Sequence, residues 1–283
     1  MSTPVTWAIQ TNFIADEQIR RVWNAAEDAG ARVQDIQVIP FSNELVSDEL
    51  GNHVPPIDGV VIPYGATKLT RLATKRGWSG LCFDPDTFRV DCWNRNRDDM
   101  LNQHVRQMSV RECMAAMEHE ADDSVWFVRP LHDLKHFDGT VTVAREIRRW
   151  MSSVDSGNFS FDGDTEVIVA PPQKIHAEWR YFIVDGAVVD GSSYRIAGQR
   201  MANAVARPEL YEQAQALADG WLPHRTCVMD VAQTDDGLKV IEFNTFNSSG
   251  FYAHDIEKIV AAVTRHFAAS PDAAAAVEAD APA

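Results

Sequence analysis

The sequence predicts an α/β unit followed by a larger α+β domain. Over roughly the first 95 residues, short apolar strands alternate with amphipathic helices, which is typical of a parallel sheet covered by helices. Further along the chain, apolar runs flank Asp-Gly turns, and such hairpins favour antiparallel pairing. A length of 283 residues with 45% hydrophobic residues is enough for one large or two modest domains.

The N-terminal unit, which we place at residues 1–95, is expected to alternate strands and helices. Val5–Ile9 is predicted to be a strand, and Asp16–Ala29 is predicted to be a helix that stops at Gly30. The remaining elements are expected at Val33–Ile39 and Gly59–Pro63 as strands, and within Lys68–Phe83 as a helix followed by a strand.

Residues 96–268 are expected to form one domain of two lobes, a central lobe at about 120–170 and a C-terminal lobe at about 171–268. The expected elements are a helix within Arg97–Glu120, strands at Val125–Val128 and Glu166–Ala170, hairpins through Asp185-Gly186 and Asp235-Asp236-Gly237, a helix at Glu209–Ala218 and a last helix from Asp255. That last helix places Ile256, Ile259, Val260, Val263 and Phe267 on one face. Residues 269–283 are expected to be a disordered acidic tail.

Acidic residues outnumber basic ones by 41 to 26, which gives a formal net charge of −15. This charge opposes broad binding to nucleic acid or to anionic membranes, whereas a local group of arginines inside a cleft is compatible with it. The chain has no apolar run of about 18 residues and no signal-peptide pattern, so we expect a cytoplasmic protein without a membrane partner. The four cysteines show no metal-binding spacing and are expected to be reduced.

Acidic and amide side chains gather on two strands near the end of the domain. Glu242 and Asn244 lie two apart in one strand and therefore project from the same face. If the preceding strand pairs through the Asp236-Gly237 turn, Asp230 joins them on that face. Two carboxylates and an amide oxygen are ligands that Mg²⁺ prefers when it also binds phosphates. The alternative is a polar outer face on which these acids simply meet water.

A loop of small residues, Asn247-Ser248-Ser249-Gly250, follows this hairpin. Its backbone N–H groups can approach a phosphate or an anionic intermediate closely, because small side chains leave room for the ligand. The loop and the acids therefore form one candidate site.

Five motifs follow one another along the second half of the chain. One is the pair of strands around Asp230 and Glu242. The others are Phe127-Val128-Arg129-Pro130 with the following Asp133-Leu134-Lys135-x-Phe137-x-Gly139, then Glu178-Trp179-Arg180-Tyr181-Phe182, then Gly191-Ser192-Ser193-Tyr194-Arg195, and the Asn244–Tyr252 loop. Together they resemble the ATP-grasp superfamily and, within it, the clade named for two arginines and a lysine. The resemblance covers roughly Arg97–Phe267 and implies a pre-ATP-grasp-like N-terminal unit followed by a two-lobed ATP-grasp domain.

The resemblance implies which residues bind ATP and Mg²⁺. The Mg²⁺ ligands would be Asp230, Glu242 and Asn244. The nucleotide-binding residues would be Arg129, Lys135, Val169, Ala170, Asn247, Ser248 and Gly250. Arg129 stands where most of the superfamily has a phosphate-binding lysine, and the backbone at Val169 and Ala170 would contact the adenine edge.

The catalytic cations implied by the resemblance are Arg180, Arg195 and Lys135. Phosphoryl transfer needs fixed positive charge opposite developing negative charge. Arg180 and Arg195 lie on the two arms of one hairpin, from which both guanidinium groups could reach the same anion. The alternative for each arginine is a surface ion pair across the strands with an acid such as Glu178 or Asp190.

The function implied by the resemblance is that of a ligase, which activates a carboxylate as an acyl phosphate, releases ADP and allows an amine to attack. A second possibility is an RNA repair or end-joining ligase of the same clade. A third is an ATP-binding module without turnover, which the single glycine of the expected phosphate loop, Gly139, would favour. The acceptor could thus be a small molecule, a peptide or an RNA end, and the sequence does not indicate the oligomeric state.

Overall fold

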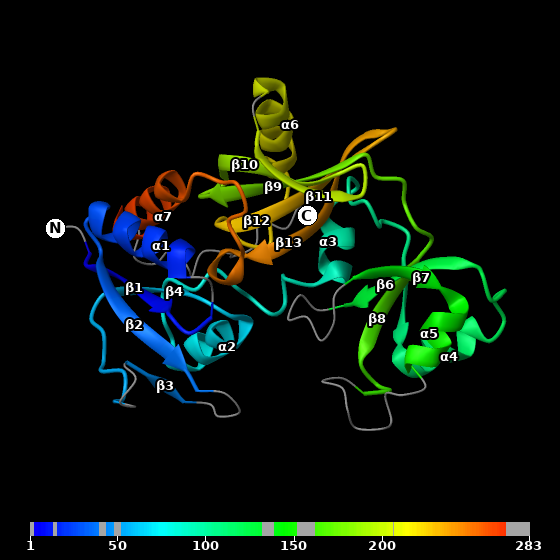
Figure 1. Cartoon of the computed structure of the whole chain (residues 1–283), viewed down its shortest axis with the longest axis horizontal. Coiled ribbons are helices and arrows are strands. Elements are labelled where there is room, and N and C mark those ends of the chain that lie inside the picture. Colours follow the sequence, from blue (N-terminus) through cyan, green and yellow to red (C-terminus); the bar gives the residue numbers. More distant parts are fainter. Residues whose placement is uncertain are drawn as a thin grey trace, which may run out of the picture.

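Sheets lie side by side along the long axis of the molecule (Figure 1). The structure is a computed structural model that describes residues 3–13, 16–39, 44–47, 52–131, 139–151, 162–205 and 207–269. Within this part of the chain, a five-stranded sheet lies between two four-stranded sheets, and helices cover them. The fold class is therefore confirmed. No described helix is long and apolar enough to cross a bilayer. Apart from Ala269, the tail expected at 269–283 lies outside the described residues.

The N-terminal unit is built on a mostly parallel sheet. Its elements are β1 (Val5–Gln10), α1 (Asp16–Asp28), β2 (Arg32–Val38), β3 (Leu45–Val46), β4 (Val60–Tyr64) and α2 (Thr67–Arg76). The strand order is β3-β2-β1-β4, in which β1 pairs in parallel with β2 and β4, and β3 runs antiparallel to β2. Every residue of β1 is buried, as expected for a parallel strand between helical layers. The predicted alternation of strands and helices is confirmed as far as α2.

One predicted strand of this unit does not form. After α2 the chain passes through turns to Phe88, and these described residues contain no strand. The backbone N–H of Cys82 donates to the Asn247 side chain at 2.7 Å and so does not join a sheet. The prediction of a strand before Phe83 is therefore wrong, because a side chain from the far end of the chain takes this N–H group.

The last helix packs on the N-terminal unit. α7 (Ile256–Ala269) lies beside α1, although the two come from opposite ends of the chain (Figure 1). The Trp7 indole N–H donates to Thr264 Oγ1 at 3.0 Å, and Arg21 donates two hydrogen bonds to Glu257. The apolar face predicted for α7 is confirmed, since all its members are buried in one core with β1 and α1: Ile256, Ile259, Val260, Val263 and Phe267.

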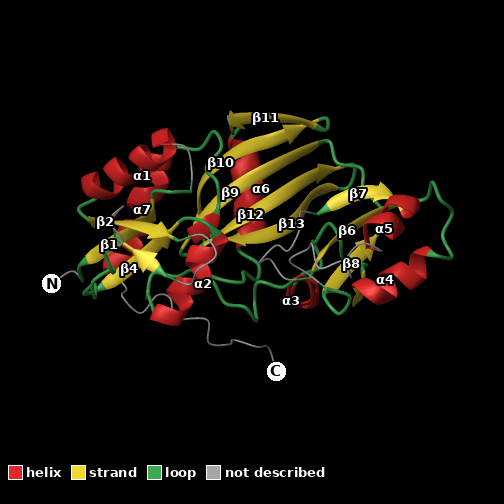
Figure 2. Ribbon diagram, turned by 60° about the horizontal axis from the view of Figure 1, so that its bottom comes forward, coloured by secondary structure: helices red, strands yellow, loops and turns green. Residues whose placement is uncertain are grey.

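The central sheet is antiparallel throughout and carries both predicted hairpins. Its strands are β9 (Ala177–Val184), β10 (Ala187–Ile196), β11 (Gln199–Ala204), β12 (Cys227–Thr234) and β13 (Gly237–Thr245), in the order β11-β10-β9-β12-β13. Asp185 and Gly186 join β9 to β10 with φ angles of 52° and 79°, which a two-residue hairpin turn requires. The predicted helix α6 (Pro208–Ala218) lies across this sheet (Figure 2).

A third sheet, with the order β5-β8-β6-β7, forms the other lobe. The elements from the end of the N-terminal unit onward are α3 (Val90–Asn96), β5 (Arg106–Ser109), α4 (Val110–Met117), β6 (Val125–Pro130), β7 (Thr140–Val143), α5 (Ala144–Met151) and β8 (Glu166–Ala170). The helix predicted over Arg97–Glu120 is confirmed only in its C-terminal part, as α4, because β5 occupies Arg106–Ser109 before it. Ser109 and Glu112 form a capping box that starts α4, so the helix begins only at Val110. Both β5 and α4 precede residue 120, near which we expected this lobe to start.

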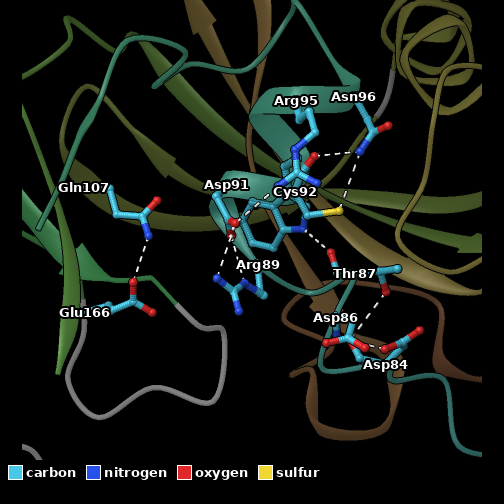
Figure 3. Close-up of polar contacts among 11 residues, drawn as sticks. Asp84, Asp86, Thr87, Arg89, Asp91, Cys92, Arg95, Asn96, Gln107 and Glu166 are labelled. Atoms are coloured by element: carbon cyan, nitrogen blue, oxygen red, sulfur yellow. Dashed lines mark hydrogen bonds and ion pairs between the residues drawn. The ribbon is translucent and has the colours of Figure 1, made fainter.

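Polar contacts connect α3 with the residues that precede it (Figure 3). Asp91 accepts hydrogen bonds from Arg89 at 2.9 and 3.3 Å, and Arg95 pairs with the same carboxylate at 3.5 Å. The Trp93 indole N–H donates to the Thr87 carbonyl at 2.8 Å. These contacts fix the Trp93 ring, which lies against a site arginine described below.

The Asn247 side chain joins the C-terminal lobe to the N-terminal unit. Its Oδ1 accepts from the Cys82 N–H at 2.7 Å, and its Nδ2 donates to the carbonyls of Pro63 at 2.7 Å and Gly80 at 3.1 Å. The side chain is buried, so water cannot replace these partners. Asn247 therefore contributes to stability as a link between two parts of the fold.

Replacing Asn247 with alanine is expected to lower the free energy of unfolding by on the order of 3 kcal/mol, because several buried backbone groups lose their partners. Chemical denaturation of the full chain measures this change. The matched control is Asn203→Ala, whose exposed side chain makes its loss worth less than about 0.5 kcal/mol. Equal stability of the two variants would contradict the linking role.

Candidate active site

Three charged side chains form a row across the central sheet. In the register of the strands, Arg180 in β9 lies opposite Asp230 in β12, and Asp230 lies opposite Glu242 in β13. Directly opposed residues point to the same face of a sheet, so the three side chains are neighbours. The hairpin pairing that the sequence predicts for Asp230 and Glu242 is therefore present, and Arg180 extends the row by one strand.

Arg180 and Asp230 form a buried, two-point ion pair. Arg180 donates from Nε to Oδ1 at 2.8 Å and from Nη2 to Oδ2 at 2.7 Å, and the two side chains are 8% and 2% exposed. Arg180 also donates to the carbonyl of Gly250 at 3.3 Å. Burial opposes the charge of Arg180, but the attraction of Asp230 outweighs it and raises the arginine pKa. Both groups are therefore charged together inside the protein.

Glu242 pairs with an arginine from the other lobe. Arg129 in β6 donates from Nη1 to Glu242 Oε2 at 2.7 Å, and this contact joins two different sheets. The Arg129 guanidinium lies 5.6 Å from the centre of the Trp93 ring. Arg129 thus stands beside a candidate metal ligand, in the position where the sequence predicts a phosphate-binding cation.

Asn244 connects the two carboxylates. Its Nδ2 donates to Asp230 Oδ2 at 3.2 Å and to Glu242 Oε1 at 3.3 Å. Among the three predicted Mg²⁺ ligands, Asn244 is therefore within hydrogen-bond distance of both others. Two carboxylates and an amide suit Mg²⁺, which takes oxygen ligands. Within the described residues no group of three or more His, Cys, Asp or Glu side chains is placed to hold a metal, so this set depends on the amide oxygen of Asn244.

A cavity of about 550 Å³ opens above this row and extends between the two lobes. Two tyrosines form part of its wall. Tyr194 and Tyr252 stack with ring centres 5.5 Å apart, and the Arg180 guanidinium lies 5.0 Å from the Tyr252 ring. Tyr252 has a φ angle of 45°, which is uncommon for a residue other than glycine. The lining includes Arg129, Glu178, Arg180, Tyr194, Arg195, Arg200, Asp230, Glu242 and Tyr252.

Arg195 lines the same cavity but is paired with an acid. It donates to Glu178 at 2.9 Å, and its side chain is 44% exposed. The cross-strand partner that the sequence offers as an alternative is therefore real, although the pair faces the cavity. Asp190, the other suggested partner, accepts instead from the Tyr211 hydroxyl and the Asp255 backbone N–H. Arg180 and Arg195 thus share one cavity, each with its own carboxylate.

The other predicted nucleotide-binding residues are more widely spread. Val169 is buried in the core of its lobe, whereas Ala170 lines a second cavity of about 380 Å³. The Gly250 carbonyl accepts a hydrogen bond from Arg180, and the Asn247 side chain donates a hydrogen bond to the backbone of the N-terminal unit. Ser248 is half-buried in a short helix. Lys135 lies outside the described residues.

Several residues that line the cavity are not among the site residues predicted from the sequence. Glu178 could have been found, because it lies two residues before Arg180 on the same strand face. Tyr194 precedes Arg195 in a motif, but nothing in the sequence indicates its contact with Tyr252. Arg200 becomes a candidate only when the register of β10 and β11 is known.

The buried side chain of His254 holds the loop behind the site in place through hydrogen bonds. His254 Nε2 hydrogen-bonds the Arg180 carbonyl at 3.0 Å, and Nδ1 lies 3.1 Å from Ser192 Oγ and also contacts the Phe251 carbonyl. Burial lowers the pKa of His254 below its ordinary value of 6.5. The His254 ring therefore links the strand that carries Arg180 to the loop that contains Phe251.

The free energy of unfolding is expected to fall as the pH drops below 6.5, the ordinary pKa of histidine. Below this pH the unfolded chain takes up a proton at His254, whereas the folded protein resists this protonation because its His254 pKa is lower. His224 and His266, whose pKa values burial also lowers, contribute in the same direction. Denaturation midpoints at pH 7.5 and about 5.5 measure the loss. His254→Gln should show a smaller loss than the exposed control His119→Gln, and equal losses would contradict this role.

Solved structures of two synthetases and of an ATP-grasp ligase share this fold at low sequence identity. D-alanyl-alanine synthetase A from Vibrio cholerae O1 biovar eltor str. N16961 matches with a TM-score of 0.59 at 13% identity, over 94% of this chain and 99% of that chain. D-cycloserine synthetase DcsG matches with a TM-score of 0.53 at 12% identity, over 93% and 99%. The ATP-grasp ligase PsnB, solved with a phosphomimetic precursor variant, Mg and ADP, matches with 0.52 at 12% identity, over 94% and 99%. At these identities the likeness shows the fold alone.

Sequence comparisons identify the family directly. A comparison with curated proteins finds no match. The model of the ATP-grasp domain, family 3 of the clade named for two arginines and a lysine, matches residues 49–263. This range is more than half of the chain and contains every described residue of the candidate site. The chain therefore belongs to family 3 of that clade of ATP-grasp domains.

Proposed function

We propose that this protein is an ATP- and Mg²⁺-dependent ligase that activates a carboxylate for attack by an amine or a similar nucleophile. Membership of the ATP-grasp family and the fold shared with ATP-grasp ligases support the use of ATP. The observation that carries the proposal is the row of Arg180, Asp230 and Glu242, which faces a cavity of about 550 Å³.

The Mg²⁺ ligands in this proposal are Asp230, Glu242 and Asn244. Their oxygen donors fit the metal, and their mutual hydrogen bonds at 3.2 and 3.3 Å keep them together. When bound, Mg²⁺ supplies positive charge that neutralises the phosphates of ATP. Arg180 holds both oxygens of Asp230 and therefore competes with the metal for this carboxylate.

Arginines supply the remaining positive charge. In the proposed reaction, an oxygen of the substrate carboxylate bonds to the terminal phosphorus of ATP while the bond to ADP breaks, which yields an acyl phosphate. The amine nitrogen then bonds to the acyl carbon, phosphate leaves, and the amine loses a proton. Arg129 and Arg180 line the cavity in which this negative charge moves, so we assign them to its stabilisation, and Arg195 lines the same cavity. Lys135 is the further cation that the clade resemblance implies.

The adenine is assigned to the end of β8. Ala170 lines the second cavity, and Leu101, Asn102 and Gln173 line both cavities, so the two adjoin. A nucleotide can therefore lie with its base near Ala170 and its phosphates near Asp230. In this proposal Val169 contributes only its backbone.

The acceptor is proposed to be a small molecule or a peptide. D-cycloserine synthetase and a ligase solved with a precursor variant share the fold and support these two classes. A net charge of −15 disfavours an RNA end as the acceptor. The complete set of metal ligands also disfavours a module that binds ATP without turnover.

Product identity tests the proposed reaction. Purified protein with ATP, Mg²⁺ and candidate amino acids or peptides is expected to release ADP and phosphate in an acceptor-dependent manner. AMP and pyrophosphate would instead indicate nucleotidyl transfer and would overturn the proposal. Glu242→Ala should abolish Mg²⁺-dependent ATP binding, measured by titration calorimetry, and unchanged affinity would remove the site assignment.

A further inference from the structure

Two arginines face each other across the outermost strands of the central sheet. In the register of β10 and β11, Arg195 lies directly opposite Arg200, and both side chains line the main cavity. Like charges in directly opposed positions destabilise a sheet. An anion held between two such guanidinium groups would remove this repulsion, since each can donate two parallel N–H groups to one carboxylate.

The charges of the cavity do not balance. Its described lining carries four arginines and three carboxylates. Each carboxylate already has an arginine, in the pairs Arg129 with Glu242, Arg180 with Asp230, and Arg195 with Glu178. Among the described residues, no acid lies within ion-pair distance of Arg200. Within the described lining, one cation therefore has no acidic partner among the described residues, in a protein whose net charge is −15.

The ion pair with Glu178 holds the Arg195 side chain in place but uses only some of the N–H donors of Arg195. Arg195 gives one contact, from Nη1, to a carboxylate that is 10% exposed. A guanidinium has five N–H donors, so others remain for a ligand. Arg195 is therefore held in place and can still bind an anion.

The pair lies apart from the groups assigned to the nucleotide. Arg195 is opposite Glu178, which precedes Arg180 by two residues, so the pair is displaced by about 7 Å along the strands from the row that contains Asp230. In the strand order, β11 is the edge strand farthest from β13, and β13 carries Glu242. The second cavity, to which we assign the adenine, is bordered by Thr234, Asp235 and Lys239 at the β12–β13 end. The arginine pair thus lies toward the opposite lateral edge of the sheet, while its level along the strands, through Glu178 and Ala232, ends at Lys239 beside the second cavity.

We propose that Arg195 and Arg200 bind a carboxylate of the organic substrate, other than the carboxylate that is activated. This inference rests on the proposed ligase function and specifies its substrate class. The substrate is then a dicarboxylate or an acidic amino acid or peptide. Its second carboxylate binds the arginine pair, while the first lies near Arg180 and the metal ligands.

Direct binding measurements test this proposal independently of turnover. The full chain, saturated with Mg²⁺ and a non-hydrolysable ATP analogue, is titrated with glutarate and with butyrate at equal ionic strength, and binding is followed by NMR. Glutarate is expected to bind at least about 10-fold more tightly than butyrate, since only glutarate can satisfy both ends of the site. Equal affinities would overturn the proposal.

Variants test whether the anion that binds the arginine pair is a carboxylate of the substrate or a group of the nucleotide. Arg200→Gln should remove the preference for glutarate and leave the affinity for the ATP analogue unchanged. The matched control is Arg265→Gln on α7, an exposed arginine that does not line the cavity, and it should retain the preference. Weaker binding of the ATP analogue to Arg200→Gln, by about 10-fold or more, would assign the pair to the nucleotide and overturn the proposal. Release of ADP is measured separately, so a failure of the ligase function is distinguishable from a failure of this inference.

Discussion

Asp230→Asn is expected to lose more than roughly 100-fold in turnover and about 3–5 kcal/mol in stability. The first loss follows from removing a proposed metal ligand. The second follows from the ion pair with Arg180, because the guanidinium then remains buried without a countercharge. Steady-state ADP release and denaturant unfolding of the same preparation measure both losses.

The control for Asp230→Asn is Asp185→Asn. Asp185 also pairs with an arginine, Arg225, at 2.7 Å, but both side chains are 58% exposed. Exposed pairs contribute at most about 1 kcal/mol, so this variant should stay near the wild-type stability and keep its turnover. If both variants lost the same stability, the burial argument for Asp230 would be wrong.

Arg180→Met is expected to lower stability by about 3–5 kcal/mol without metal, because buried Asp230 then loses the countercharge and the two hydrogen bonds that Arg180 supplies. Mg²⁺ should restore much of this loss, since a cation that binds the folded state stabilises it in proportion to its affinity. In the wild-type protein, Arg180 already neutralises Asp230, so Mg²⁺ alone should have a smaller effect. The difference between the two responses reports competition between the arginine and the metal for the same carboxylate.

Thermal unfolding with and without Mg²⁺, at constant ionic strength, measures these responses. Arg225→Met serves as the control, because it breaks an exposed ion pair and should respond to Mg²⁺ as the wild type does. A variant Arg180→Met that responds no more strongly than the wild type would show that Asp230 does not bind the metal. Loss of turnover in Arg180→Met is also expected, but it does not distinguish these cases.

Local patterns were sufficient to predict the two hairpins of the central sheet, but not its edge strand β11 or the pairing of β9 with β12. The Asp-Gly turns and alternating apolar residues fixed both hairpins, and the two-residue spacing of Glu242 and Asn244 placed them on one face. Because strand pairing is local in a hairpin, Asp230 could be added without knowing the rest of the fold. The candidate metal ligands were therefore the most predictable part of the site.

Contacts between distant segments were not predictable in this way. The pairing of Arg129 with Glu242 depends on how two sheets face each other, and no periodicity encodes that. The opposition of Arg195 and Arg200 depends on a register shift between Ser193 and Arg195, a bulge that changes which residues face each other. The start of the helix expected over Arg97–Glu120 was predicted too early for a different reason. The sequence contains the capping box at Ser109, which marks the true start of this helix.

The packing of α7 on the first strand and helix has a consequence for synthesis on the ribosome. The segment that ends with β4 emerges first, but the helix that completes its core begins roughly 190 residues later. At a translation rate of about 5–20 residues per second, Val22 and Ala26 stay uncovered for roughly 10–40 s. The nascent chain is therefore expected to need protection from aggregation until its C-terminal end is released, and a version truncated before Ile256 should be a client of chaperones.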